Sequence, residues 1–227
     1  MPPLTAADVL RVPHLSKLPE HAAEALASEL LVRTYLPRES VANEGEVCRG
    51  FFQILSGRAR LLRTGPDGRE QIMRILHPGE TFGEVAVLDG GPFPATVDTL
   101  EESTVILIPS AVFLRVLGEY PIVATELLRY LARRLRSFTE LVEQISLQTV
   151  QQRVARYLYV TAREEGHDVP EGVLIARAIT LGDLAALVGS VREVVSRTLH
   201  IIESDGVVEV RRKEILIRDI EALRRLL

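Results

Sequence analysis

The sequence predicts an α+β protein: an N-terminal β-roll, a long helix and a C-terminal winged helix-turn-helix. Three observations carry this prediction. Short apolar runs separated by glycine-rich turns extend to about Pro109. A run without Gly or Pro follows over residues 122–165. Two helix starts with capping residues then lie ten positions apart, before two short alternating runs near the end of the chain.

Composition limits the classes of protein to consider. The chain has 227 residues and is 47% hydrophobic, enough for two packed domains. No stretch approaches the ~20 apolar residues of a membrane span, and the first residues lack the order of a signal peptide, so we expect a cytoplasmic protein without a membrane partner. The single cysteine, Cys48, cannot form an internal disulfide. No Ser/His/Asp or metal-ligand pattern is present, so we expect no enzyme, metal or cofactor.

The charge distribution argues against coating of nucleic acid by bulk positive charge. The formal net charge is −4, and residues 148–227 hold 12 Lys and Arg against 12 Asp and Glu. The whole negative excess therefore lies before residue 148. Any contact with nucleic acid has to be local.

The first 120 residues are predicted to form the β-roll. Turn-forming sequences at 43–45, 66–68 and 77–79 separate short apolar runs such as 51–55 and 71–76. Many short strands at such spacing are typical of a roll or barrel. An Ala/Glu/Leu-rich stretch over 18–31 predicts a helix before it.

A long helix is predicted over residues 121–147. Pro121 suits a first helical turn, and apolar residues then recur at alternating spacings of three and four. Such a helix either lies on its own domain or pairs in parallel with a second copy; its length and strict alternation favour a homodimer. Thr149 followed by Gln152 resembles a capping box, so we place the domain boundary near residues 146–148. The expected dimer interface is Leu128, Leu131, Leu135, Phe138, Val142 and Ile145.

Residues 148–227 are predicted to form a winged helix. Thr180 followed by Asp183, and Ser190 followed by Glu193, predict two helix starts. Gly189 stands between them, where the chain must turn sharply. Alternating runs over 206–210 and 214–217 predict a hairpin with a basic tip, formed by Arg211, Arg212 and Lys213.

The second of these helices, from Val191 to about Glu203, carries the candidate DNA-reading face. Spacings of four place Arg192 with Ser196, and Glu193 with Arg197, on one side. Arginine can bond guanine bidentately, and glutamate can accept from cytosine. A purely structural helix pair is the alternative, with Glu193 as a capping partner or paired to Arg197. The predicted wing favours the DNA-binding interpretation, with double-stranded DNA as the partner. The expected DNA-binding residues are Thr180, Ser190, Arg192, Glu193, Ser196, Arg197, Arg211, Arg212 and Lys213.

The order Arg-Glu-Val-Val-Ser-Arg over residues 192–197 resembles the recognition helix of the cyclic-AMP receptor protein/fumarate–nitrate regulator (CRP/FNR) family. Residues 81–88 are similar to its cyclic-nucleotide cassette, 132–135 to its dimer helix and 179–208 to its DNA-binding motif. The resemblance implies a dimeric transcription regulator, with RNA polymerase as a partner. It also implies that the protein binds inverted DNA repeats. Each half-site would have a TGA core, read by Glu193 and Arg197. Because Arg192 is typical of one branch and Ser196 of the other, the outer bases stay open.

The chain departs from the family's sequence pattern in the cyclic-nucleotide cassette. Nucleotide-binding members have Arg-Ser-Ala where this chain has Phe93-Pro94-Ala95, which removes the cyclic-phosphate clamp. Glu84 and Thr139 match residues that contact the ribose and the base. We therefore expect an effector other than cyclic AMP, or none. The alternatives are a cyclic-nucleotide-binding regulatory protein and a haem-based gas sensor using His77. The expected pocket residues are Gly83, Glu84, Phe93, Pro94, Ala95 and Thr139.

Overall fold

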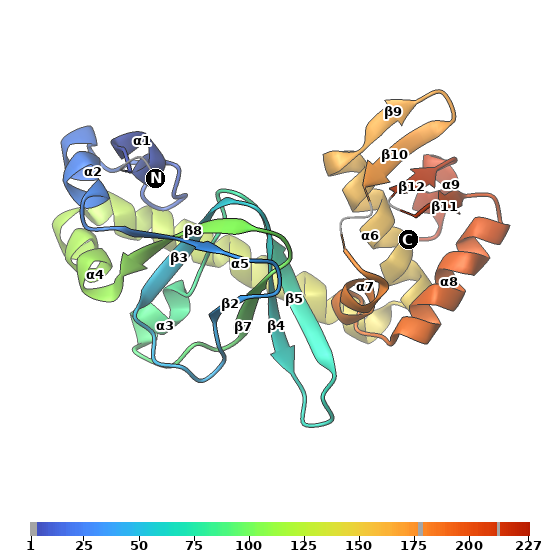
Figure 1. The fold of residues 1–227 in the computed structure, drawn as a ribbon, viewed down its shortest axis with the longest axis horizontal. Helices are drawn as coiled ribbons and strands as arrows, with labels where there is room; N and C mark the ends of the chain where they lie inside the picture. Colours follow the sequence, from blue (N-terminus) through green and yellow to red (C-terminus); the bar gives the residue numbers. More distant parts are fainter. Residues whose placement is uncertain (1–3, 177–178, 213) are drawn as a thin grey trace. The chain divides into compact units, whose positions relative to one another are not determined.

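The structure is a computed structural model that describes residues 4–176, 179–212 and 214–227 (Figure 1). The chain divides into two compact units. The first comprises residues 1–63 and 73–138, and the second comprises residues 64–72 and 139–227. Within the described residues, no helix is both long and apolar enough to cross a membrane.

Two four-stranded sheets form a β-roll, as the sequence predicts. One sheet has the order β1 (Leu31–Tyr35), β8 (Ser103–Pro109), β3 (Gly50–Ser56) and β6 (Thr81–Phe82). The other has the order β2 (Ser40–Ala42), β7 (Thr96–Thr99), β4 (Ala59–Thr64) and β5 (Glu70–Leu76). Alternation along the strands places one set of side chains between the sheets. That inner core includes Phe52, Ile54, Leu76, Phe82, Phe93, Val97 and Val105.

Helices cover the outer face of the first sheet. They are α1 (Ala6–Leu10), α2 (Glu20–Ala27), α4 (Ser110–Glu119) and the first part of α5 (Pro121–Leu147). The short α3 (Glu84–Asp89) follows β6. The helix predicted over 18–31 is shorter than expected, because Leu31 already pairs with Leu107 of β8. Strand pairing here overrides the helix propensity of the sequence.

The second unit is a winged helix. It contains α6 (Val150–Glu165), α7 (Leu181–Leu187), α8 (Arg192–Ser204) and α9 (Ile220–Arg225). Its sheet has the order β11 (Val208–Val210), β12 (Glu214–Ile217), β10 (Gly172–Ala176) and β9 (His167–Val169) (Figure 1). The predicted wing, β11 and β12, is thus joined by two strands that the sequence analysis missed. The fold-class prediction is confirmed.

Candidate nucleic-acid interface and effector site

A tight turn joins α7 to α8. The predicted capping box begins α7: Asp183 N–H donates to Thr180 Oγ1 over 3.1 Å, and Thr180 N–H donates to Asp183 Oδ2 over 3.2 Å. At the other end Gly189 has φ +62°, a conformation that a side chain disfavours. Ser190 N–H then donates to Ala185 O over 2.9 Å, which closes a Schellman motif. Glycine is therefore required where the sequence predicts the turn.

The predicted capping box between Ser190 and Glu193 is wrong. The N-cap of α8 is Val191, without a side-chain capping bond, so the helix begins one residue later than expected. The reason is that Ser190 belongs to the turn, where its backbone is held by Ala185. Glu193 stays in the first helical turn and is exposed.

Helix α8, the predicted recognition helix, has one buried and one exposed side. Val195, Thr198, Leu199 and Ile202 are buried in the domain core. The structure places the four predicted reading residues together on the opposite side, and among the described residues no ion pair joins Glu193 to Arg197. A helix with free polar groups in its first two turns fits the DNA major groove. The exposed residues are Arg192, Glu193, Ser196 and Arg197.

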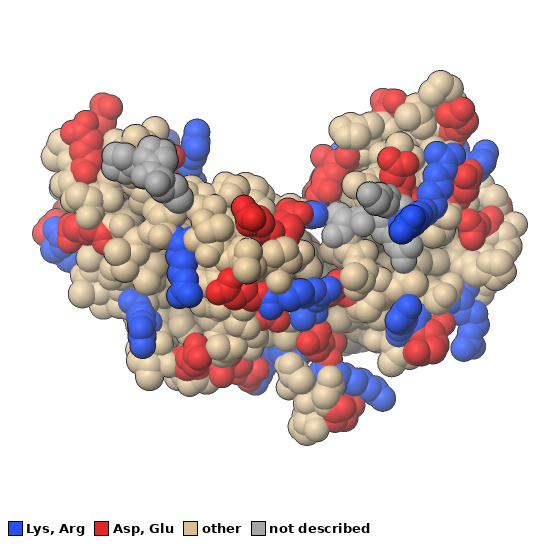
Figure 2. All heavy atoms as spheres, viewed as in Figure 1, with Lys and Arg blue, Asp and Glu red and all other residues tan. Residues whose placement is uncertain are grey.

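The basic side chains of the wing are partly compensated. Arg211 Nε donates to Glu209 Oε1 over 2.8 Å, and Arg218 also bonds Glu209. These hydrogen bonds lower the pKa of the Glu209 carboxyl. Arg212 is exposed, and Lys213 lies outside the described residues. Arg218 is a basic residue that the sequence analysis missed, because it follows the predicted hairpin rather than its tip. Figure 2 shows blue and red side chains interspersed on the face in view.

Inside the β-roll, Phe93 fills the place predicted for the phosphate clamp. The residue is 6% exposed, and its ring centroid lies 6.0 Å from that of Phe52. A Cβ placed on Gly83, whose φ is +94°, would lie 3.0 Å from Phe93 Cε1. The Phe93 N–H donates to Glu46 O over 2.9 Å, so this amide is already used. Pro94 is exposed and has no N–H, while Ala95 is buried.

Glu84 is buried beside Tyr130 rather than in open solvent. It is 4% exposed, and its Oε1 has no hydrogen-bond partner among the described residues. Burial raises the pKa of this carboxyl, while hydrogen bonding to Thr81 opposes the shift. Thr139, the remaining predicted pocket residue, is exposed on the part of α5 that belongs to the second unit. The structure therefore brings Gly83 and Phe93 together, whereas the Glu84 side chain lies beside Thr81 and Tyr130.

Several arginines of the first unit form ion pairs with carboxylates. Neither Arg74 nor Arg134 was predicted as a site residue, because nothing in the local sequence signals their shared partner. The pairs and their shortest N–O distances are Arg58–Glu101 at 3.0 Å, Arg60–Asp98 at 3.3 Å, Arg134–Glu80 at 2.8 Å and Arg74–Glu80 at 3.9 Å.

The predicted dimer seam is an exposed apolar stripe along α5. Leu128, Leu135 and Val142 are 67%, 70% and 62% exposed, and Phe138 and Ile145 are also exposed. Leu131 differs from them, because it is half-buried against the core of the first unit. A row of large apolar side chains in water is costly unless another surface covers it.

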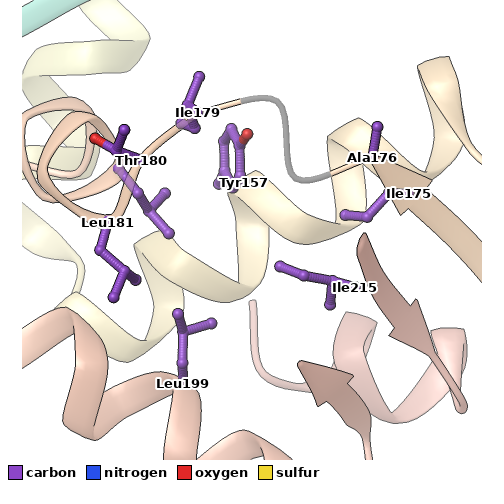
Figure 3. A pocket seen from close by; sticks show the side chains of 9 residues that line it. Tyr157, Ile175, Ala176, Ile179, Thr180, Leu181, Leu199 and Ile215 are labelled. Carbon is purple, nitrogen blue, oxygen red and sulfur yellow. The ribbon is translucent and has the colours of Figure 1, made fainter. Parts of the chain in front are cut away.

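The second unit also contains an apolar pocket beside the start of α7 (Figure 3). The described residues that line it come from α6, β10, α7, α8 and β12 and from the segment before α7, and Tyr157 and Thr180 contribute hydroxyls. No charged side chain of the described residues lines this pocket.

Two family models match the chain. "Cyclic nucleotide-binding domain" matches residues 32–120, and "Crp-like helix-turn-helix domain" matches residues 152–226. A CRP-like cAMP-activated global transcriptional regulator of Mycobacterium tuberculosis is 30% identical, covering 91% of this chain and 92% of the relative. A cyclic AMP receptor protein of Thermus thermophilus is 32% identical, covering 78% and 79%. FixK2 of Bradyrhizobium japonicum shares the fold, with TM-score 0.75, 24% identity and coverage of 87% and 96%.

A β-roll joined to a winged helix with an exposed reading face defines a DNA-binding transcription regulator with a sensor-type domain. The chain belongs to the CRP/FNR family of transcription regulators, which are not enzymes.

Proposed function

We propose that this chain is a cytoplasmic, homodimeric regulator that binds inverted DNA repeats with TGA-core half-sites and needs no cyclic AMP. In this proposal residues 1–120 form the sensor, 121–147 the dimerisation helix and 148–227 the DNA-binding domain. The observation that carries it is the exposed polar face of α8, over a turn closed by Gly189.

The bases of each half-site would be read by Glu193 and Arg197, with Arg192 and Ser196 beside them. Glu193 and Arg197 are exposed, and among the described residues no ion pair joins them. Binding DNA therefore breaks no ion pair between these two residues. Thr180, Ser190 and the wing residues Arg211, Arg212 and Lys213 would contact phosphates, which position the domain without reading sequence.

Dimerisation would bury the α5 stripe against the same stripe of a second copy. Parallel pairing through alternating three- and four-residue spacing brings like residues together along a two-fold axis. A two-fold dimer presents its recognition helices to a palindrome, with half-site centres about 34–36 Å apart, one helical turn, or a multiple of that. RNA polymerase would be the protein partner, as the resemblance to transcription regulators implies.

Two features support an effector other than cyclic AMP, or none. Phe93 occupies the inner core where a phosphate clamp would stand, and Arg60 of β4 and Arg134 of α5 already have carboxylate partners. Burying a phosphate without a cation costs far more than burying a neutral group. Cyclic AMP itself is the second candidate, because the M. tuberculosis relative is described as cAMP-activated and this chain keeps Glu84.

Selection of binding sites from random DNA tests the proposal. We expect the wild-type protein to enrich inverted repeats with TGA cores. Arg197→Ala should lose about 1–3 kcal/mol per half-site through the missing guanine contact. Arg163→Ala, an exposed arginine on α6, is the matched control. Enrichment of unrelated, non-palindromic sequences would contradict the proposal.

A further inference from the structure

Arg153 of α6 joins the end of the long helix to the turn of the helix-turn-helix. Its Nε donates to Val188 O over 2.6 Å, and its Nη2 donates to Gly189 O over 3.4 Å. Its Nη1 donates to Gln144 O over 3.4 Å and also bonds Gln148 O. One guanidinium thus donates hydrogen bonds to four backbone carbonyls, and all of these groups lie in the second unit.

The four carbonyls belong to two helix C-termini. Gln144 lies in the last turn of α5 and Gln148 directly follows that helix, whereas Val188 is the C-cap of α7 and Gly189 follows it. The last carbonyls of a helix carry partial negative charge, and most of them lack partners within the helix; Gln144 O also accepts from the Gln148 N–H over 3.1 Å. A single cation therefore bonds carbonyls at both helix ends, and burial lowers the pKa of its guanidinium.

A second contact supports the same joint. The side chain of Ile145, near the end of α5, packs on the turn: a Cβ placed on Gly189 would lie 3.7 Å from Ile145 Cγ1. Ile145 is also in the proposed dimer seam. The turn that orients the recognition helix is thus attached, by one polar and one apolar contact, to the end of the helix that would pair the two copies.

We propose that Arg153 is a positioning residue that sets the separation and orientation of the two recognition helices in the dimer. This inference rests on the proposed function, because only a dimer bound to a palindrome has two recognition helices to align. Lysine cannot replace the guanidinium. An ammonium is a point charge, whereas arginine offers donors in a planar fork that reaches both helix ends at once.

The test compares DNA with one half-site, DNA with the full palindrome and palindromes with altered spacing. The two-headed wild-type dimer should bind the full site ~10²-fold or more tighter than a half-site, because the second contact is intramolecular. Arg153→Lys should keep half-site affinity within about twofold, yet lose roughly tenfold or more of the full-site advantage. It should also accept spacings that the wild type rejects. Arg163→Lys, on the exposed side of α6, is the matched control.

Circular dichroism and light scattering should show a folded dimer for Arg153→Lys. If this variant unfolds, the comparison passes to Arg153→Gln; unfolding of both would overturn the inference, since Arg153 would then be a folding residue. Unchanged spacing selectivity in a folded dimer would also overturn it. Failure of the wild type to prefer the half-site over scrambled DNA would instead contradict the proposed function.

Discussion

His14 is enclosed by aromatic rings and has no polar partner among the described residues. Its ring centroid lies 4.9 Å from that of Phe51, 5.4 Å from Phe113 and 5.6 Å from Tyr130, and the residue is 0% exposed. Burial lowers its pKa from 6.5 to about 4. Such a shift ties the stability of the fold to pH, because the unfolded chain takes up a proton that the folded chain excludes.

His14→Leu should therefore remove a pH dependence. Between pH 6.5 and about 4 the unfolded wild type binds the extra proton, so its stability falls as pH falls, by about 3 kcal/mol in total. The variant should lose that slope, measured by urea unfolding at several pH values. His21→Leu, at an exposed histidine, should keep it. Equal slopes for the wild type and His14→Leu would show that His14 titrates normally.

Glu84→Gln should stabilise the protein at neutral pH. Because burial raises the pKa of Glu84 in the folded state, the unfolded carboxyl ionises first as pH rises above 4.5, and the wild type loses stability there. The side-chain amide of the Glu84→Gln variant does not ionise, so the variant does not lose this stability. The advantage of Glu84→Gln should thus vanish below pH 4.5, where the carboxyl is protonated in both states, and thermal unfolding at pH 4 and pH 7 measures it. A destabilised variant at pH 7 would indicate that ionised Glu84 is needed in the fold.

Single residues also mark where sequence reasoning fails. The capping box at Thr180 is purely local, so it could be predicted, whereas Ser190 has the same pattern but serves the Schellman turn through its backbone. The substitution at Phe93 was visible in the sequence. Its packing on Gly83 was not, because that contact depends on where β6 and the 90–95 loop meet.

At the scale of elements, helices with strong local patterns were predicted well. The starts of α5 and α6 were marked by Pro121 and by the Thr149 capping box. Strand β10 was missed because it pairs with β12, which is distant in sequence, while β9 pairs with β10 and its three residues, His-Asp-Val, are too few for an alternating pattern. The helix predicted over 18–31 was too long, because the last of these residues, Leu31, pairs with β8 as part of a strand. Such long-range pairing leaves little trace in a local window.

The α5 seam makes an element-scale prediction. Leu135→Asp would bring two carboxylates together in an apolar interface at a cost of several kcal/mol, so the dimer should dissociate and operator binding should fall with it. Light scattering and a DNA-shift assay measure both. Ser137→Asp adds the same charge off the stripe, at an exposed position, and should remain dimeric. A dimer of wild-type size for Leu135→Asp would show that the copies pair elsewhere.

At the scale of the whole molecule, the sequence patterns of apolar runs, turns and helix starts predict the two-domain organisation. They do not predict the signal that the sensor domain receives. The family model over residues 32–120 is that of a cyclic nucleotide-binding domain, although the interior of this roll is packed with phenylalanines. Phe52 and Phe82 stack with ring centroids 4.9 Å apart, and Phe93 lies against them. Fold and ligand are therefore separable, because a few side chains inside a conserved architecture decide what it binds.

Cyclic AMP should consequently bind the wild-type protein weakly or not at all. Loss of a charge partner in a desolvated site costs ~2–5 kcal/mol, or about 30- to 4,000-fold, which takes a micromolar site to or beyond the millimolar range. Isothermal titration of ligand-free protein measures this. Replacing Phe93 by Arg and Pro94 by Ser restores the charge and hydroxyl of the clamp, so the double variant should gain affinity, while Pro92→Ser, at an exposed proline nearby, should not. Low-micromolar binding by the wild type, with tighter operator binding on saturation, would show that a cation now paired within the roll, such as Arg58 or Arg60, exchanges its carboxylate for the phosphate.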